Sequence, residues 1–119
     1  MAYNFQSRFD ECINEEKVFL NPKLTLTDLA LKVGTNRTYM SNYINRVLNT
    51  TYFDFINSLR LEHATEMLIS TNFTLEVIAE KSGFNSLSTF NSLSTFRRYF
   101  ISVHKCSPTV YKRKHKKNV

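Results

Sequence analysis

The residues of this sequence that could do chemistry are polar side chains in two groups, and their types favour hydrogen bonding over bond making. The first group is interleaved with apolar residues at 40, 43, 44 and 47, so helical projection places it on the opposite face. Arginine suits guanine edges and phosphate, asparagine suits adenine, and small hydroxyl residues let a helix lie close to a groove. The first group comprises Arg37, Thr38, Ser41, Asn42, Asn45 and Arg46.

The second polar group lies about fifty residues further on, in a stretch rich in serine and threonine. An ordinary polar helix surface, or a set of competing helix caps, would have a similar composition. Half or more of protein–DNA hydrogen bonds go to the sugar-phosphate backbone of the DNA. The two polar groups therefore predict which surfaces contact DNA, and they do not predict which residue contacts a base. The second group comprises Asn91, Ser92, Ser94, Thr95, Arg97 and Arg98.

The other reactive side chains form no catalytic pattern. We find no nucleophile–base set, phosphate loop or paired carboxylates, so an enzyme is not expected. The three histidines are scattered and the two cysteines lack metal-ligand spacing, so we predict no cofactor and no metal site. The tyrosines near the polar groups are interpreted as core or boundary packing. These residues are His63, His104 and His115; Cys12 and Cys106; and Tyr39, Tyr43 and Tyr99.

The composition favours a helical protein with a polyanionic partner. Only two glycines and two prolines occur in 119 residues, which argues against a β fold with many tight turns. The net charge of +6 suits nucleic acid, although a solvated surface with a basic tail would give the same balance. Without a signal peptide or a long apolar run, we expect a cytoplasmic protein that does not enter a membrane, with both cysteines reduced.

The spacing of apolar residues predicts a series of helices. One amphipathic helix is expected over 5–19, ended by Asn21 and Pro22. Thr27 is then predicted to cap a short helix that ends at Gly34 in a left-handed turn, and a second helix follows to about residue 48. A short helix, a tight turn and a second helix are the outline of a helix-turn-helix. A long helix over 52–69 comes next and would span roughly 25–30 Å.

After the long helix the first pattern returns. Thr74 caps, Gly83 turns, and an alanine again lies four residues before the glycine. This divergent repeat predicts a second helix-turn-helix, whose second helix ends near residues 100–103. Ser107 is expected to cap a final helix that Pro108 opens. The predicted fold is all-α with about seven helices, divided into 1–22, 23–51, a linker helix over 52–71, and 72–119.

The sequence resembles the AraC/XylS family of bacterial transcription regulators over residues 24–113. Three sets of residues carry the resemblance: LRLEHA at 59–64 with ML at 67–68; IA at 78–79, SGF at 82–84, Phe96, Phe100, SP at 107–108 and Tyr111; and DLA at 28–30, VG at 33–34 and YMS at 39–41. The resemblance implies two recognition helices, joined by a rigid helix, that enter successive major-groove segments of double-stranded DNA. One turn of that duplex advances about 34 Å, close to the reach of the linker helix and its end turns.

The resemblance also implies partners and a larger protein. RNA polymerase is an implied partner, and family members usually join this domain to an upstream sensor, receiver or ligand-binding portion. The chain therefore resembles a C-terminal fragment, with a free-standing short regulator as the alternative. Arg98 occupies a position where the family usually carries a basic residue.

The sequence departs from the family pattern at two places. Lys105 replaces a frequent glycine, which predicts a helix end without a left-handed cap. The hexapeptide NSLSTF at 85–90 is repeated at 91–96, where the family needs one copy. We predict that the second copy is the working recognition segment, because Leu93, Phe96, Phe100 and Val103 share a broad face. The first copy would lengthen the turn or add a loose leading turn.

Two functions compete on these observations. One is a sequence-specific DNA-binding domain; the other is a helical protein-interaction module whose DNA reading is impaired by the duplicated segment. A homodimer is also considered, since a stretched turn could favour exchange of the last helices between two chains.

Overall fold

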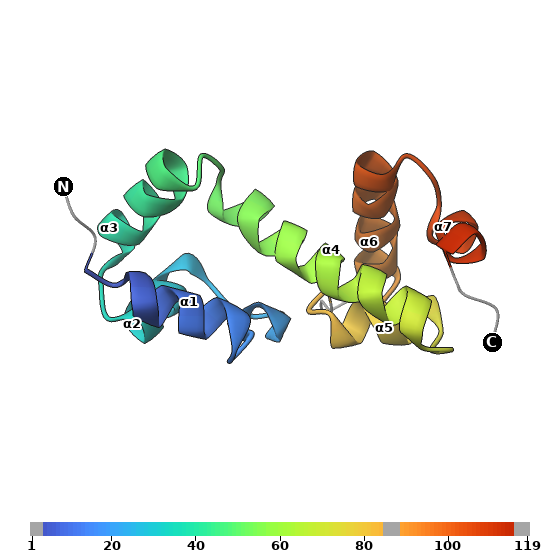
Figure 1. Cartoon of the computed structure of the whole chain (residues 1–119), viewed down its shortest axis with the longest axis horizontal. Helices are drawn as coiled ribbons and strands as arrows, with labels where there is room; N and C mark the ends of the chain where they lie inside the picture. The colour runs from blue at the N-terminus through green and yellow to red at the C-terminus, as the bar shows by residue number, and fades with distance from the viewer. Residues whose placement is uncertain (1–3, 85–88, 116–119) are drawn as a thin grey trace. The chain divides into compact units, whose positions relative to one another are not determined.

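The structure is a computed structural model of the whole chain, and it describes residues 4–84 and 89–115 (Figure 1). Every regular element in those ranges is a helix, which confirms the predicted all-α class. The chain divides into two compact units, unit 1 over 1–58 and unit 2 over 59–119. Among the described helices, none is both long and apolar enough to cross a membrane.

Unit 1 consists of short helices that pack around buried aromatic and aliphatic side chains. Its elements are α1 (Gln6–Asn14), the 3₁₀ turn η1 (Val18–Leu20), α2 (Leu26–Val33), α3 (Arg37–Asn42), the π-helical turn η2 (Tyr43–Val47) and the first part of α4 (Tyr52–Ser70). The observed α4 agrees with the long helix predicted over 52–69. The second helix of the first helix-turn-helix is thus built from α3 and η2 together.

The first helix is shorter than predicted. The backbone N–H groups of Glu15 and Glu16 both donate to the Glu11 carbonyl oxygen at 3.0 Å, which closes the helix after Asn14. Lys17 then adopts a left-handed conformation with φ 50°. The continuous helix over 5–19 was therefore wrong, because this reversal separates Phe19 from α1 and places it in a 3₁₀ turn. Phe19 is nevertheless buried, as its apolar side chain requires.

The cap of α2 lies two residues before the predicted one. Thr25 Oγ1 accepts from the Asp28 N–H at 3.1 Å, and the Asp28 carboxylate accepts from the Thr25 N–H at 3.2 Å. This reciprocal capping box satisfies two backbone donors that a helix start leaves free, whereas Thr27 is an exposed residue inside the first turn. Gly34 ends α2 with φ 89°, which confirms the predicted left-handed turn.

Aromatic contacts hold α3 and η2 against α1 and the start of α4. The Phe9 ring lies 5.1 Å from that of Tyr43 and 5.8 Å from that of Phe55, measured between centroids. The Tyr43 hydroxyl donates to Gln6 Oε1 at 2.6 Å, which satisfies its polar end beside the core. The Tyr52 hydroxyl donates to the Leu24 carbonyl oxygen at 3.0 Å. These contacts fix the rotation of α3 and η2 about their axis.

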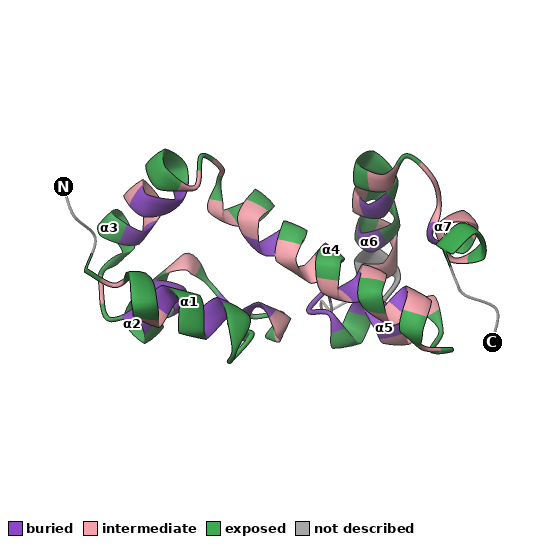
Figure 2. Ribbon diagram, in the orientation of Figure 1, coloured by how far each residue is buried: buried purple, intermediate pink, exposed green. Residues whose placement is uncertain are grey.

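Unit 2 repeats this plan with the rest of α4 and three further helices. These are α5 (Leu75–Lys81), α6 (Thr89–His104) and α7 (Pro108–His115). The predicted caps are confirmed: Thr74 Oγ1 accepts from the Val77 N–H at 3.3 Å, and Ser107 Oγ accepts from the Val110 N–H at 3.2 Å. The core of the unit contains Leu61, Ala64, Leu68, Ile78, Ala79, Phe84, Phe96 and Phe100 (Figure 2).

The end of α6 keeps the left-handed turn although it has no glycine. Lys105 has φ 62°, and its backbone N–H donates to the Ile101 carbonyl oxygen at 2.9 Å. Its ammonium Nζ donates to the Ser102 carbonyl oxygen, also at 2.9 Å. The expectation that this helix end lacks a left-handed cap was therefore wrong: the turn forms with a side chain that adds strain and recovers one hydrogen bond.

We predict that Lys105→Gly stabilises the protein by about 1 kcal/mol, because glycine adopts a positive φ without the steric cost of a Cβ. Equilibrium urea unfolding followed by circular dichroism measures the change. The control is Lys105→Ala, which loses the Nζ hydrogen bond and keeps the strain, so it should be no more stable than the parent. Equal stability of the glycine and alanine variants would show that the left-handed turn carries no strain.

His104 joins three helices of unit 2. Its Nε2 lies 3.2 Å from Thr65 Oγ1, and the Thr65 hydroxyl already donates to the Leu61 carbonyl oxygen at 2.8 Å, so Nε2 carries the hydrogen and donates. The imidazole ring lies 4.4 Å from Phe100 and 4.6 Å from Tyr111 between centroids. Burial lowers the pKa of His104 below its ordinary value, and the nearby His115 lowers it further. The folded chain thus favours the neutral imidazole.

This lowered pKa predicts acid sensitivity of unit 2. The unfolded chain binds a proton at His104 before the folded chain does, so the free energy of unfolding falls as the pH drops below about 6.5. His104→Gln keeps a donor for Thr65 and does not titrate, so its stability should vary less over this range. Urea unfolding at pH 5 to 8 measures both proteins. Parallel pH curves would assign the acid sensitivity to other groups.

Candidate nucleic-acid interface

The first candidate surface lies on α3 and η2. Asn36 caps α3: its side-chain Oδ1 accepts from the Tyr39 N–H at 2.9 Å, so the helix begins at Arg37. Met40, Tyr43 and Ile44 are buried on the inner side. The six predicted residues lie outside this inner set: Arg37, Thr38, Asn45 and Arg46 are exposed, and Ser41 and Asn42 are partly buried.

The π-helical turn alters the predicted projection of this surface. The Leu48 N–H donates to the Tyr43 carbonyl oxygen at 3.1 Å, a bond that spans five residues instead of four. The widened turn shifts Asn45 and Arg46 around the helix relative to an α-helical projection. Asn45 Nδ2 lies 3.4 Å from Ser41 Oγ, so these two polar side chains still share one side. No sequence signal predicted this turn.

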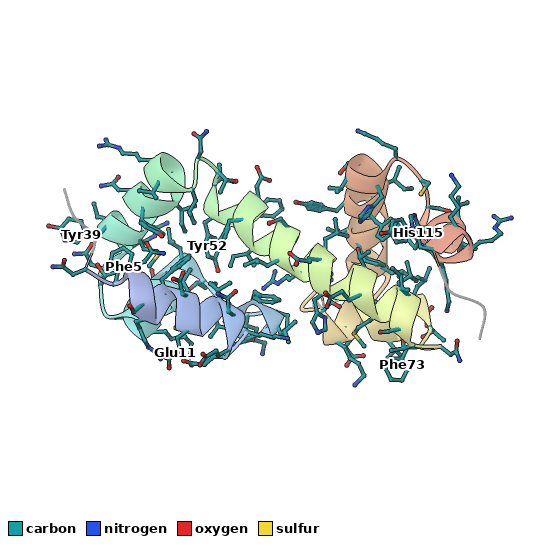
Figure 3. All side chains as sticks on the ribbon, in the orientation of Figure 1. Phe5, Glu11, Tyr39, Tyr52, Phe73 and His115 are labelled. Carbon is teal, nitrogen blue, oxygen red and sulfur yellow. The ribbon has the colours of Figure 1, made fainter. Side chains whose placement is uncertain are left out.

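Tyr39 is a surface residue that the sequence interpretation missed. It had been assigned to packing, but 44% of it is exposed, and in Figure 3 it points away from the neighbouring helices. It precedes Asn42 by three residues and Arg46 by seven, which is the spacing of one helical stripe. That spacing was the available signal. Tyr43, by contrast, is buried as predicted, and Val47 of the supposed inner series is exposed.

The second candidate surface lies on α6, which contains the whole second copy of the repeated hexapeptide. Phe96, the last residue of that copy, is fully buried, and its ring centroid lies 5.2 Å from Phe84 and 5.9 Å from Phe100. The predicted face is confirmed for Leu93, Phe96 and Phe100. It is wrong for Val103, which is exposed, because His104 occupies the position four residues after Phe100.

The first copy contributes the beginning of α6. Its last two residues, Thr89 and Phe90, are the first two residues of the helix. Residues 85–88 of that copy lie outside the described residues. In the predicted polar group, Thr95, Arg97 and Arg98 are exposed and Ser94 is partly buried. Asn91 and Ser92 lie in α6, and their side chains are outside the described part of the chain.

Each candidate surface combines cationic and neutral hydrogen-bonding groups. The polar group of α3 and η2 contains Arg37 and Arg46, that of α6 contains Arg97 and Arg98, and neither group contains a carboxylate. Such surfaces suit phosphate oxygens and base edges.

The histidines and cysteines, to which the sequence analysis assigned no chemistry, lie outside the two polar groups. His104 and His115 are not scattered: both rings lie against Tyr111, with centroid separations of 4.6 and 4.0 Å. His63 Nδ1 is 3.0 Å from Ser82 Oγ. Within the described ranges, no three His, Cys, Asp or Glu side chains are grouped to hold a metal ion. Cys12 and Cys106 are both free thiols, and burial raises the pKa of Cys12.

Comparison with known proteins agrees with this geometry. Residues 29–114 match a family model described as a helix-turn-helix domain, of the AraC type. Among curated proteins, a regulator from Bacillus subtilis, the HTH-type transcriptional regulator YfiF, is 32% identical over 66 residues, which are 56% of this chain and 21% of that protein. The chain thus spans about a fifth of the length of the curated relatives that it matches.

Solved structures share the fold over nearly the whole chain. The C-terminal domain of AraT, a response regulator from Geobacillus stearothermophilus, superposes with a TM-score of 0.80 at 25% identity, covering 98% of this chain and 89% of that one. The DNA-binding domain of AdpA, solved in complex with a target DNA, has a TM-score of 0.75 at 13% identity, covering 95% and 93%.

The fold and the matching sequence model define a helix-turn-helix protein of the kind found in transcription regulators. More specifically, the chain belongs to the AraC-type helix-turn-helix family, as its sequence motifs indicated.

Proposed function

We propose that this chain is the sequence-specific DNA-binding domain of a bacterial transcription regulator. The observation that carries the proposal is the repeated arrangement of a polar, arginine-containing face behind a buried apolar one, on the second helix of each helix-turn-helix. A relative with this fold has been solved on its target DNA, which supports the same partner here.

In this proposal α3 with η2, and α6, enter successive segments of the major groove. Arg37, Arg46, Arg97 and Arg98 contact guanine edges or phosphates, and Asn42, Asn45 and Asn91 are proposed to bind adenine because the amide side chain matches its edge. Thr38, Ser41, Ser92, Ser94 and Thr95 allow close approach. The recognition segments read hydrogen-bonding groups and catalyse no reaction, so no cofactor is required.

The wider protein is inferred from the relatives. AraT is a response regulator, and the curated relatives extend well beyond the matched region, so we propose an upstream sensor or receiver domain. The protein would act in the cytoplasm with RNA polymerase as a second partner, and a homodimer would place two copies on DNA.

Removing a recognition cation should weaken binding at the chosen site. A duplex selected by the parent chain from a random library serves as the target, with a scrambled duplex beside it. Arg46→Gln should cost about 1–3 kcal/mol on the selected duplex and lower the ratio of the two affinities, because a base contact carries specificity. Fluorescence anisotropy titration measures both affinities.

The matched control for this experiment is Lys23→Gln. Lys23 is exposed and lies outside α3 and η2, and its substitution removes one positive charge, as Arg46→Gln does. It should leave the affinity ratio unchanged. If Arg46→Gln lowers the affinity for both duplexes equally, Arg46 contacts phosphate and not a base. Absence of any selected sequence would contradict the proposed function and favour the helical interaction module.

Removing one hexapeptide copy should improve DNA binding. Since the two copies are identical, deleting 85–90 or 91–96 produces the same polypeptide, with a single NSLSTF between Phe84 and Arg97. The N-terminal residues of a recognition helix contact bases, and Thr89 and Phe90 lengthen α6 by two residues at that end. We expect the single-copy chain to bind its selected duplex about tenfold more tightly, a gain of about 1.4 kcal/mol.

Circular dichroism provides the control for this deletion, because a folded single-copy chain should keep its helical signal. Weaker binding by a folded single-copy chain would show that the extra residues belong to the working surface.

A further inference from the structure

The net charge of the protein is confined to unit 2. Residues 59–119 hold ten of the sixteen Lys and Arg residues and four of the ten Asp and Glu residues, whereas residues 1–58 hold six of each. Glu80 is the last acidic residue, and nine cationic residues follow it. The candidate recognition group on α6 accounts for only two of these nine, so most of this charge lies outside the surface already described.

Three consecutive cations of this stretch lie in α7. The helix is anchored through Pro108, which is buried, and through the Tyr111 ring, whose centroid lies 5.5 Å from that of Phe100. Lys112 is partly buried, and its Nζ donates to the Thr71 carbonyl oxygen at 3.4 Å. Lys112 is therefore used within unit 2.

Arg113 and Lys114 differ from Lys112 in both exposure and contacts. Both are exposed, and neither pairs with a carboxylate, since the ion pairs of the described residues join Arg8 to Glu11 and Glu16 in unit 1. The tyrosine contact fixes which side of α7 faces the core: Arg113, two residues after Tyr111, lies on the opposite side of the helix, and Lys114 lies at the exposed flank. Two unpaired cations on an ordered helix are a surface for an anionic partner.

We propose that Arg113 and Lys114, on the outer face of α7, bind the phosphate backbone of double-stranded DNA as a contact separate from both recognition helices. The proposal rests on the proposed function, which supplies the polyanion. The guanidinium of Arg113 donates two parallel hydrogen bonds to phosphate oxygens, and the ammonium of Lys114 acts as a compact charge beside it. These contacts carry no base information and supply sequence-independent affinity.

Cations in the last turn of a helix also interact favourably with the helix dipole, which is the simplest competing role for these residues. The two roles differ in a measurable way. A phosphate contact releases a condensed counterion, so each one adds about 0.9 to the slope of log affinity against log salt concentration. If the two cations only interact with the helix dipole, their removal changes the stability of the protein and leaves that slope unaltered.

The test compares the full chain with Arg113→Gln/Lys114→Gln on the selected and the scrambled duplex, from 50 to 300 mM KCl. We expect the salt slope to fall by about 1.8 on both duplexes, and the affinity near 0.1 M salt to fall roughly tenfold or more. The ratio of the two affinities should stay constant. Arg113→Lys/Lys114→Arg keeps both charges and should keep the parent slope.

The charge-matched control is Lys17→Gln/Lys23→Gln, which removes two exposed cations from unit 1 outside the helix-turn-helix. Its slope should stay close to that of the parent. The inference fails if the parent binds but the α7 variant keeps its slope, if only its melting temperature falls, or if the unit 1 control loses as much slope. Failure of the parent to bind either duplex would instead refute the proposed function.

Discussion

Burial of one apolar face on the second helix of each helix-turn-helix is the constraint on which the rest depends. In unit 2 the rings of Phe84, Phe96 and Phe100 meet in the core, and in unit 1 Tyr43 packs against Phe9. A helix with one side fixed in this way has no rotational freedom, so its polar side must face solvent. The candidate interface is thus a consequence of core packing, and each short supporting helix serves to complete that core.

The same constraint explains how the chain accommodates six extra residues. Inserted into a helix, they rotate its C-terminal part by about 120° relative to its N-terminal part, so both flanks cannot keep their packing. The C-terminal flank keeps it: Phe96 and Phe100 are buried and Tyr111 closes over them. The described apolar contacts of α6 lie on that side. The second copy therefore keeps the packed register, and α6 begins two residues before it, at Thr89.

The helices, their order and the glycine turns were predictable because periodicity and turn residues are local signals. The predictions were wrong where two neighbouring residues could both cap a helix, or where tertiary contacts determine the local conformation. Thr25 and Thr27 are both good caps, and only Asp28 three residues after Thr25 completes a capping box. The break after Asn14 depends on Lys17 in a conformation that its side chain does not favour, as does the turn at Lys105. Tyr39 was misassigned because an aromatic type alone does not distinguish a core position from an exposed one.

The widened turn at residues 43–47 has a consequence for how such domains diverge. A π-helical turn holds one residue more than the α-helical turn it replaces, and here it forms the C-terminal end of the recognition segment, which closes at Val47. Loss of one residue after Ile44 would shorten the exposed end of the segment, where Asn45, Arg46 and Val47 lie, and leave the buried Met40, Tyr43 and Ile44 in place. The length of this exposed end is therefore free to change by single residues without a change in the core that supports it.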